Sequence, residues 1–304
     1  MQAIYDVLAP AKLNLFLHIT GRRPDGYHLM QSVFMLIDWC DTLHFERRSD
    51  GHISRTDVFD PVCSSNKNAA DEPLPADDLC VRAAKALQHA CGTSYGVNIR
   101  LEKRIPSQAG MGGGSTDAAS CLLALQRLWG VRLPDAELLT MAARLGADVP
   151  FFLSRGHAWV EGIGDRIRNI ELPSADFLVV KPAAGLSTKA IFKAHGLKKD
   201  SETATLGGET EEDFLLDQTL MLSTFGRNDL QSIALNLCPE ISQSLDWLIS
   251  KNLQGRMTGS GSAVFAKIPV DSNFLSCATC LSDAPVGCKI RLCSNLKLHP
   301  LIGW

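Results

Sequence analysis

The sequence predicts a protein of two domains that mixes α and β structure. The chain has 304 residues, 45% of them hydrophobic, and a single core stops growing at roughly 250–300 residues, so two cores are expected. Segments that alternate apolar and polar residues are interspersed with segments of helical spacing along the whole chain. Strands and helices are therefore expected in both halves, with a hinge near Pro173 and Ser174.

In the first half, period-two alternation predicts strands and three-to-four spacing predicts helices. Residues 60–77 are polar, contain prolines and follow neither period, so we expect a surface loop there. Strands are expected at residues 11–20, 32–39, 42–47, 96–104, 157–162 and 166–170, and helices at residues 78–91, 117–129 and 133–145.

The second half shows the same two patterns in shorter segments. A polar stretch at residues 198–212 predicts another loop, and the small residues Thr258–Ser262 predict either a tight turn or a ligand contact. Strands are expected at residues 177–181, 255–257, 263–268 and 289–293, and helices at residues 188–195, 229–237, 241–251 and 272–281.

The composition argues against several classes of protein. The net charge is −3, so no strongly basic face for nucleic acid is indicated. The first twenty residues lack the basic start of a signal peptide, and Lys12 and Asn14 interrupt their apolar run. No stretch approaches the ~18–20 apolar residues of a membrane span. We expect a cytoplasmic protein that binds neither nucleic acid nor membrane, as a monomer or a homodimer.

Ten cysteines raise the question of disulfides or zinc. Disulfides are not expected in a long chain without an export signal. Cys277 and Cys280 form one C-x-x-C pair, and Cys288 and Cys293 follow with a wider spacing. Because structural zinc sites usually combine two short pairs or add histidines, zinc is the less favoured alternative. We expect free thiols and assign no metal ligands.

The most informative segment is a glycine-rich loop between an expected strand and an expected helix. Glycines allow the backbone to approach a ligand and to turn successive N–H groups toward it. The helix that follows adds unpaired N–H groups and a positive dipole end, and Ser115 or Thr116 is a plausible cap for it. The sequence therefore predicts a phosphate site. Its residues are Pro106, Ser107, Gln108, Ala109, Gly110, Met111, Gly112, Gly113, Gly114, Ser115 and Thr116.

Other well-known phosphate loops fit this segment poorly. No lysine follows Gly114, as the G-x-x-x-x-G-K-[ST] loop requires. The G-x-G-x-x-G pattern lacks its acidic ribose contact, and the short motifs of protein kinases do not occur. The remaining alternative is a flexible loop before a helix.

Two further segments carry groups that suit chemistry. Lys12 and Asn14 are two apart in a strand and so face the same side, where they suit phosphate or hydroxyl groups. Taken alone, Lys12 is more simply explained as a surface lysine. Asp148 stands among apolar neighbours and suits a proton acceptor, although a helix cap before Pro150 explains it equally well.

Four motifs stand in one order along the chain: PAKLNLFL, GMGGGSTDAA, GADVPFF and TGSGSAVFA. Together they resemble the GHMP kinases, the superfamily that includes galactokinase, homoserine kinase and mevalonate kinase. The start PAKLNLFL with RPDGYH is most similar to the branch that acts on a cytidine-diphosphate-linked methylerythritol in the non-mevalonate route to isoprenoid precursors. The resemblance extends over nearly the whole chain.

The resemblance implies an α+β fold of two GHMP kinase domains with the active site between them. Residues 1–170 would form the ATP-binding domain, similar to domain 2 of ribosomal protein S5. Residues 171–304 would form a ferredoxin-like domain. The implied reaction uses ATP, with Mg²⁺, and moves the γ-phosphate to the 2-hydroxyl of the methylerythritol part of a small cytidine diphosphate substrate.

The resemblance also implies roles for single residues. Asp148 matches the catalytic base, and Lys12 matches the residue that orients it and offsets charge. Phe192 matches an aromatic residue that stacks on the cytosine ring. The implied substrate contacts are Asn14, Tyr27, His28, Thr188, Phe192, Ser260 and Gly261.

This sequence departs from the family pattern at two positions. Asp78 stands where the family usually has an asparagine near the adenine, and a carboxylate cannot donate the hydrogen bond that an amide gives. Asp117 stands where the family often has another asparagine; beside a triphosphate it would be repulsive unless it points away or helps to hold magnesium.

Three other functions stay open from the sequence. One is a GHMP kinase for a smaller alcohol such as homoserine. Another is a nucleotide-binding regulator without activity, against which the presence of both Lys12 and Asp148 argues. The third and most distant is a dinucleotide-dependent oxidoreductase.

Overall fold

Two long antiparallel strands run through the centre of the molecule. In the computed structural model, β1 (Ala3–Arg22) pairs with β2 (His28–Arg48) along its whole length, with register shifts such as that between Pro10 and Lys12. The structure describes residues 1–59, 74–154, 156–194, 201–204, 222, 225–269 and 283–304.

The expected break in the second strand is wrong, because β2 is continuous across residues 40 and 41. The aspartate at position 41 is a polar break in the apolar pattern, but Asp41 is fully buried. Its carboxylate accepts hydrogen bonds from the N–H groups of Arg104 (2.6 Å) and Ile105 (2.8 Å). A buried carboxylate that is satisfied by backbone donors is compatible with a strand.

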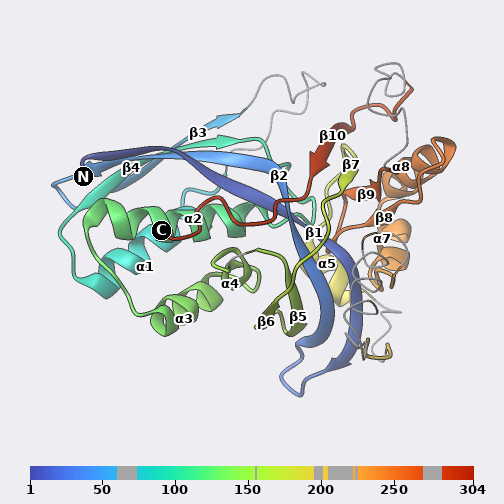
Figure 1. The fold of residues 1–304 in the computed structure, drawn as a ribbon, viewed down its shortest axis with the longest axis horizontal. Helices are drawn as coiled ribbons and strands as arrows, with labels where there is room; N and C mark the ends of the chain where they lie inside the picture. The colour runs from blue at the N-terminus through green and yellow to red at the C-terminus, as the bar shows by residue number, and fades with distance from the viewer. Residues whose placement is uncertain (60–73, 155, 195–200, 205–221, 223–224, 270–282) are drawn as a thin grey trace.

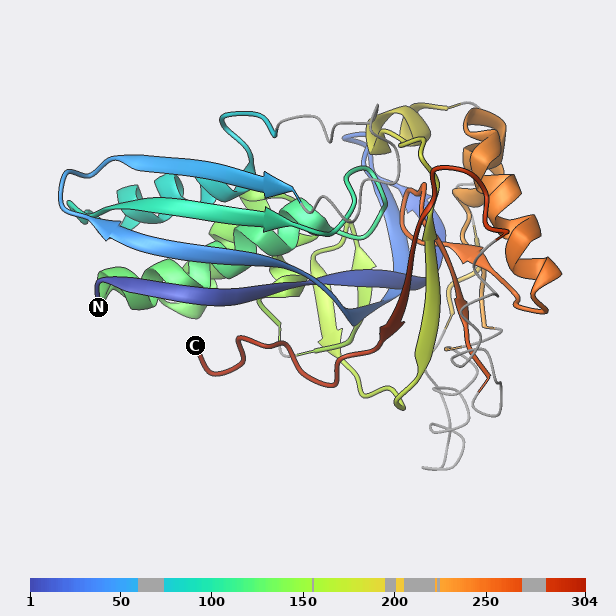
Figure 2. The same ribbon diagram turned by 90° about the horizontal axis from the view of Figure 1, so that it is seen from above.

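The N-terminal sheet holds β1, β2 and four further strands in the order β3-β4-β2-β5-β6, with β1 paired to β2. Helices cover one face of this sheet (Figures 1 and 2). The strands are β3 (Ile53–Phe59), β4 (Gly96–Lys103), β5 (Ala158–Gly162) and β6 (Arg166–Asn169), and the helices are α1 (Leu79–Cys91), α2 (Gly113–Trp129), α3 (Asp135–Leu145) and the single turn α4 (Val149–Phe152).

The second sheet is antiparallel and has the order β10-β7-β9-β8. Figure 1 shows it between the long strands and the helices α7 and α8. Its strands are β7 (Asp176–Lys181), β8 (Arg256–Met257), β9 (Val264–Lys267) and β10 (Lys289–Ser294), and the helices beside it are α5 (Thr188–Lys193), α7 (Gln231–Leu237) and α8 (Pro239–Ser250).

Three hydrophobic clusters hold these layers together. One lies between the N-terminal sheet and its helices, and another between the second sheet and helices α7 and α8. The third joins β1 and β2 to the second sheet. Strand β7 serves two clusters, because Phe177 faces the long strands while Leu178 faces the helices, as the two-residue period of a strand dictates.

Most helices and strands lie close to their expected positions, but β1 begins at Ala3 rather than at residue 11, and the patterns did not predict β3 and α4. The expected helix at 272–281, most of the expected loops at 60–77 and 198–212, and the pair Cys277 and Cys280 fall outside the described residues. Seven cysteines of the described part are free thiols. In the same part of the chain, no helix is long and apolar enough to cross a membrane.

Candidate active site

At two positions the glycine-rich loop has a backbone conformation that residues other than glycine rarely adopt. Gly110 and Gly112 have φ angles of +72° and +73°, in the left-handed region. A Cβ on Gly110 would lie 2.3 Å from the carbonyl oxygen of Thr258, and one on Gly112 would lie 2.8 Å from the ring of Phe152. The loop therefore needs glycine here for close packing as well as for its turn.

Helix α2 begins inside the glycine run, earlier than the sequence predicts. Its N-cap is Gly112, and no side chain caps it, so the expected cap at Ser115 or Thr116 is wrong. The first intrahelical bond runs from the N–H of Thr116 to the carbonyl of Gly112 (2.9 Å). The N–H groups of Gly113, Gly114 and Ser115 precede it and have no intrahelical acceptor, which leaves them available to an anion.

The loop is hydrogen-bonded to both halves of the chain. Lys12 in β1 donates its backbone N–H to the carbonyl of Met111 (3.0 Å). On the other side, the N–H groups of Ser262 and Ala263 bond to the carbonyls of Gln108 (3.1 Å) and Ala109 (3.2 Å). The loop is thus fixed between the first long strand and the turn that follows β8.

A cavity of about 1110 Å³ opens along this loop. It exceeds the ~300–1,000 Å³ of a pocket for one small ligand, so it has room for two. Every residue of the predicted phosphate segment from Pro106 to Ser115 lines it, whereas Thr116 is buried and does not.

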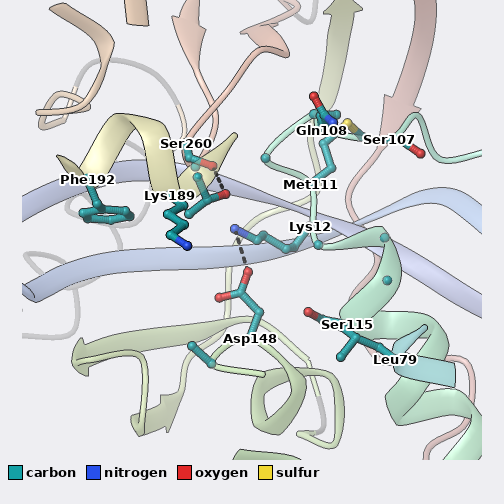
Figure 3. A pocket seen from close by; sticks show the side chains of 18 of the residues that line it. Lys12, Leu79, Ser107, Gln108, Met111, Ser115, Asp148, Lys189, Phe192 and Ser260 are labelled. Carbon is teal, nitrogen blue, oxygen red and sulfur yellow. Dashed lines mark hydrogen bonds and ion pairs between the residues drawn. The ribbon is translucent and has the colours of Figure 1, made fainter. Parts of the chain in front are cut away.

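The Lys12 ammonium lies 3.5 Å from the Asp148 carboxylate, and the two side chains meet at the cavity (Figure 3). Lys12 is only 3% exposed, so the simpler explanation of a surface lysine is wrong. Its ammonium also bonds to Asn14 and lies 4.5 Å from the centre of the Phe34 ring. Burial lowers the pKa of Lys12, and Asp148 opposes this effect.

Asp148 stands at the start of α4, but its side chain makes no capping hydrogen bond. The alternative explanation as a helix cap is therefore not supported. The side chain is 32% exposed and faces the cavity, where it is open to a ligand.

Aromatic residues also line the cavity, and Phe192 lies on the other side of Lys12 from the glycine-rich loop (Figure 3). The rings of His28 and Phe192 lie 5.3 Å apart with an angle of 31° between them. Tyr27 is 62% exposed at the rim. This end of the cavity has the flat apolar faces that a base stacks on.

The turn after β8 closes the cavity from the second half of the chain. The hydroxyl groups of Thr188 and Ser260 lie 2.7 Å apart, and both residues line the cavity. Gly261 does not: it is buried in the turn, where its N–H bonds to the carbonyl of Thr258 (2.9 Å). Its neighbour Gly259 lines the cavity in its place.

Sequence reasoning missed a buried charged triad behind the loop. Lys103, at the end of β4, forms ion pairs with Asp41 of β2 and with Asp117 of α2, the latter at 2.8 Å. Burial alone would lower the pKa of Lys103, but the two carboxylates outweigh it and the pKa is raised. Asp117 is thus held by Lys103, which explains how an aspartate is accommodated next to a phosphate site.

Asp78 is also engaged within the protein. Its carboxylate caps α1 by accepting the N–H of Val81 (3.0 Å), and it forms an ion pair with Arg55. An aspartate at this position therefore has a structural role, while Leu79 beside it lines the cavity.

Lys189 is a second residue that the sequence analysis missed. It lines the cavity between Thr188 and Phe192, both of which were predicted. The sequence could have indicated Lys189, because it precedes the predicted site residue Phe192 by three positions in an expected helix, and residues three apart on a helix share a face.

Comparison with known proteins places these features in a family. The family model for the N-terminal domain of GHMP kinases matches residues 78–156, and that for the C-terminal domain matches residues 216–269. A 4-diphosphocytidyl-2-C-methyl-D-erythritol kinase from Polaromonas sp. (strain JS666 / ATCC BAA-500) is 67% identical over 100% of this chain and 95% of its own length. The chain belongs to this kinase family. The kinase of the same name from Polaromonas naphthalenivorans (strain CJ2) is 63% identical over 100% of this chain and 97% of its own length.

A solved structure supports the same placement. The crystal structure of a 4-(cytidine 5'-diphospho)-2C-methyl-D-erythritol kinase is 31% identical and has a TM-score of 0.76, covering 95% of this chain and 98% of that one. The predicted α+β fold of two GHMP kinase domains is confirmed. The division at residues 170 and 171 stays a prediction.

Proposed function

We propose that this kinase transfers the γ-phosphate of ATP to the 2-hydroxyl of 4-(cytidine 5'-diphospho)-2-C-methyl-D-erythritol, a step in isoprenoid precursor synthesis by the non-mevalonate pathway. The observation that carries the proposal is one cavity with three parts in line. It has open N–H groups at the start of α2, the Lys12–Asp148 pair beside them, and the His28–Phe192 rings beyond. The relatives named for this reaction match the whole chain.

The glycine-rich loop would hold the phosphates of ATP. Phosphoryl transfer needs alignment and charge compensation more than covalent help. The N–H groups of Gly113, Gly114 and Ser115 offer both, because they are fixed by the helix and lie at its positive end.

Asp148 would accept the proton of the acceptor hydroxyl, and Lys12 would hold that carboxylate in place. Lys12 suits this role because it is itself fixed by Asn14 and by the wall of the cavity. Its positive charge would also offset the charge that develops on the transferred phosphoryl group.

Mg²⁺ would be bound mainly by the phosphates of the nucleotide, as it commonly is in kinases. The Ser115 hydroxyl is an oxygen donor on the cavity wall that suits this ion. Bound there, it would neutralise charge on the phosphates.

The aromatic end of the cavity would bind the cytosine ring. The Phe192 and His28 rings already lie 5.3 Å apart with an angle of 31° between them, so a base placed against them gains contact without a large rearrangement. Thr188 and Ser260 would offer hydroxyl groups to the rest of the acceptor.

The proposal is tested by ADP release with different acceptors. We expect turnover with the cytidine-diphosphate methylerythritol and none above background with homoserine or mevalonate. The absence of turnover with the cytidine substrate would exclude the proposed function.

The role of Asp148 is tested by Asp148→Asn. We expect kcat to fall by ~100-fold or more while the Kd for ATP stays within about twofold, because the amide keeps the size of the side chain but cannot accept the proton. Asp246→Asn, at an exposed position of α8 outside the cavity, is the matched control. Near-normal turnover in Asp148→Asn would remove Asp148 as the base.

A further inference from the structure

Lys189 occupies the middle of the cavity wall. It lies in α5 three residues before Phe192, so both side chains project from one face of that helix. In Figure 3, the Lys189 side chain extends from α5 toward the Lys12–Asp148 pair, and Phe192 lies on its other side. Its ammonium thus lies between the aromatic end of the cavity and the reacting end.

In the part of the chain that the structure describes, no carboxylate pairs with the Lys189 ammonium. Lys12 has Asp148 as its partner, and Lys103 has two buried carboxylates. Within the described ranges, by contrast, no ion pair or side-chain hydrogen bond involves the Lys189 ammonium, which is exposed to the cavity. A solvated lysine needs no partner on an open surface, but here the charge faces a ligand site and favours an anion.

We propose that Lys189 binds the diphosphate of the acceptor substrate. This inference rests on the proposed function, in which the cytosine lies at Phe192 and the reacting hydroxyl lies at Asp148. The diphosphate joins these two parts of the acceptor covalently, so it must pass between them. Lys189 lies at that place and offers a point charge with three donors. In the proposed function the phosphates of ATP bind elsewhere, on the glycine-rich loop that lines the cavity beyond Lys12.

Binding of cytidine and of cytidine 5'-diphosphate measures this contact without any reaction. Both are titrated by calorimetry into the protein with saturating ADP, which fills the nucleotide site. We expect the wild-type protein to bind the diphosphate more tightly than the nucleoside. Lys189→Met should reduce this preference by about 10-fold, the effect of losing one charge-assisted hydrogen bond, and leave the Kd of cytidine unchanged.

Two control variants accompany the test. Lys189→Arg keeps a positive charge and should retain most of the preference for the diphosphate. Lys297→Met removes an exposed lysine that does not line the cavity, and it should change neither Kd.

The possible outcomes separate the inference from the proposed function. An unchanged preference in Lys189→Met overturns the inference alone, as does an equal loss of affinity for both ligands. If Lys189→Met lowers kcat but keeps the preference for the diphosphate over the nucleoside, the lysine acts on the transferred phosphate. That result also overturns the inference. If the wild-type protein binds neither cytidine nor its diphosphate, the proposed function itself fails.

Discussion

Lys12 is buried although lysine is among the residue types most often exposed. Burial of an ammonium is costly unless a charge and hydrogen bonds compensate it. Asp148 and Asn14 provide that compensation, and both were predicted as site residues on separate grounds. The two-residue spacing of Lys12 and Asn14 indicated a shared face, but a strand pattern does not tell which face is buried.

Phe192 offers a test at the scale of one side chain. We expect Phe192→Ala to raise KM for the cytidine substrate by about 10-fold, because stacking on an aromatic residue is worth ~1–3 kcal/mol, and to leave KM for ATP unchanged. Steady-state kinetics with each substrate varied in turn provide the measurement. Phe192→Tyr keeps the ring and serves as the control. Equal effects on both substrates would contradict the assigned role.

The sequence predicted the helices and strands whose apolar residues recur with a clear period. It did not predict those whose position is fixed by tertiary contacts. Strand β3 was missed because it lies at the edge of its sheet and has no fully buried residue, so its alternation is weak. The early start of α2 was missed because glycine has a low helix propensity. There, the absence of Cβ atoms serves the close approach to Lys103 and Ile105.

The loop and the helix behind it form one functional unit. The Asp41 carboxylate accepts the backbone N–H groups of the two residues just before the loop. Through its ion pair with Lys103, it is also linked to Asp117 in the first turns of α2. Both ends of the phosphate segment are therefore tied to one buried triad. Such a link would restrict the loop before ATP arrives and so would lower the entropic cost of the proposed binding.

Gly112→Ala tests whether the loop geometry matters for ATP. We expect the Kd for ATP to rise by more than about 10-fold, because the new methyl group meets both a positive φ and the ring of Phe152 at 2.8 Å. Gly130→Ala is a matched control: it has a similar φ of +67°, but a Cβ there meets nothing within 4 Å. It should cost about 1 kcal/mol of stability and leave ATP binding intact. Similar ATP affinities in the two variants would refute the close-packed loop.

The whole molecule depends on contacts that cross the expected domain boundary. The central hydrophobic cluster combines residues of β1 and β2 with residues of β7, β9 and β10. The C-terminal segment then returns to the N-terminal sheet, where Leu296 donates its N–H to the carbonyl of Leu36 (3.0 Å). Its last residue, Trp304, lies against Arg127 of α2, 4.7 Å from the guanidinium carbon to the ring centre. Such long-range contacts leave no local pattern in a sequence.

Two buried histidines lie where this C-terminal segment meets the N-terminal sheet. The Nδ1 atom of His157 accepts the N–H of Leu36 (3.2 Å), and that of His299 accepts the N–H of Leu301 (3.1 Å). Both rings are therefore neutral in the fold. Burial lowers the pKa of each to about 4, from an ordinary value of 6.5.

The depressed pKa values predict a loss of stability in acid. Above pH 6.5 both histidines are neutral in the folded and the unfolded chain, so their contribution to stability is complete there. As the pH falls from 6.5 toward 4, the unfolded chain takes up protons that the folded chain excludes. The free energy of unfolding should then drop by about 2 kcal/mol for each histidine between pH 7 and pH 4.5.

Urea unfolding at a series of pH values provides the measurement. His157→Asn is the informative variant, because the amide oxygen can replace Nδ1 as the acceptor for Leu36 but does not titrate. The slope of unfolding free energy against pH gives the number of protons taken up on unfolding. In this variant, that number should decrease by about one between pH 4 and 6.5. His89→Asn, at an exposed position near the end of α1, should leave the slope unchanged. If His157→Asn and wild-type protein have the same slope, the buried ring is not the source of the acid sensitivity, and the C-terminal contact must be stabilised independently of pH.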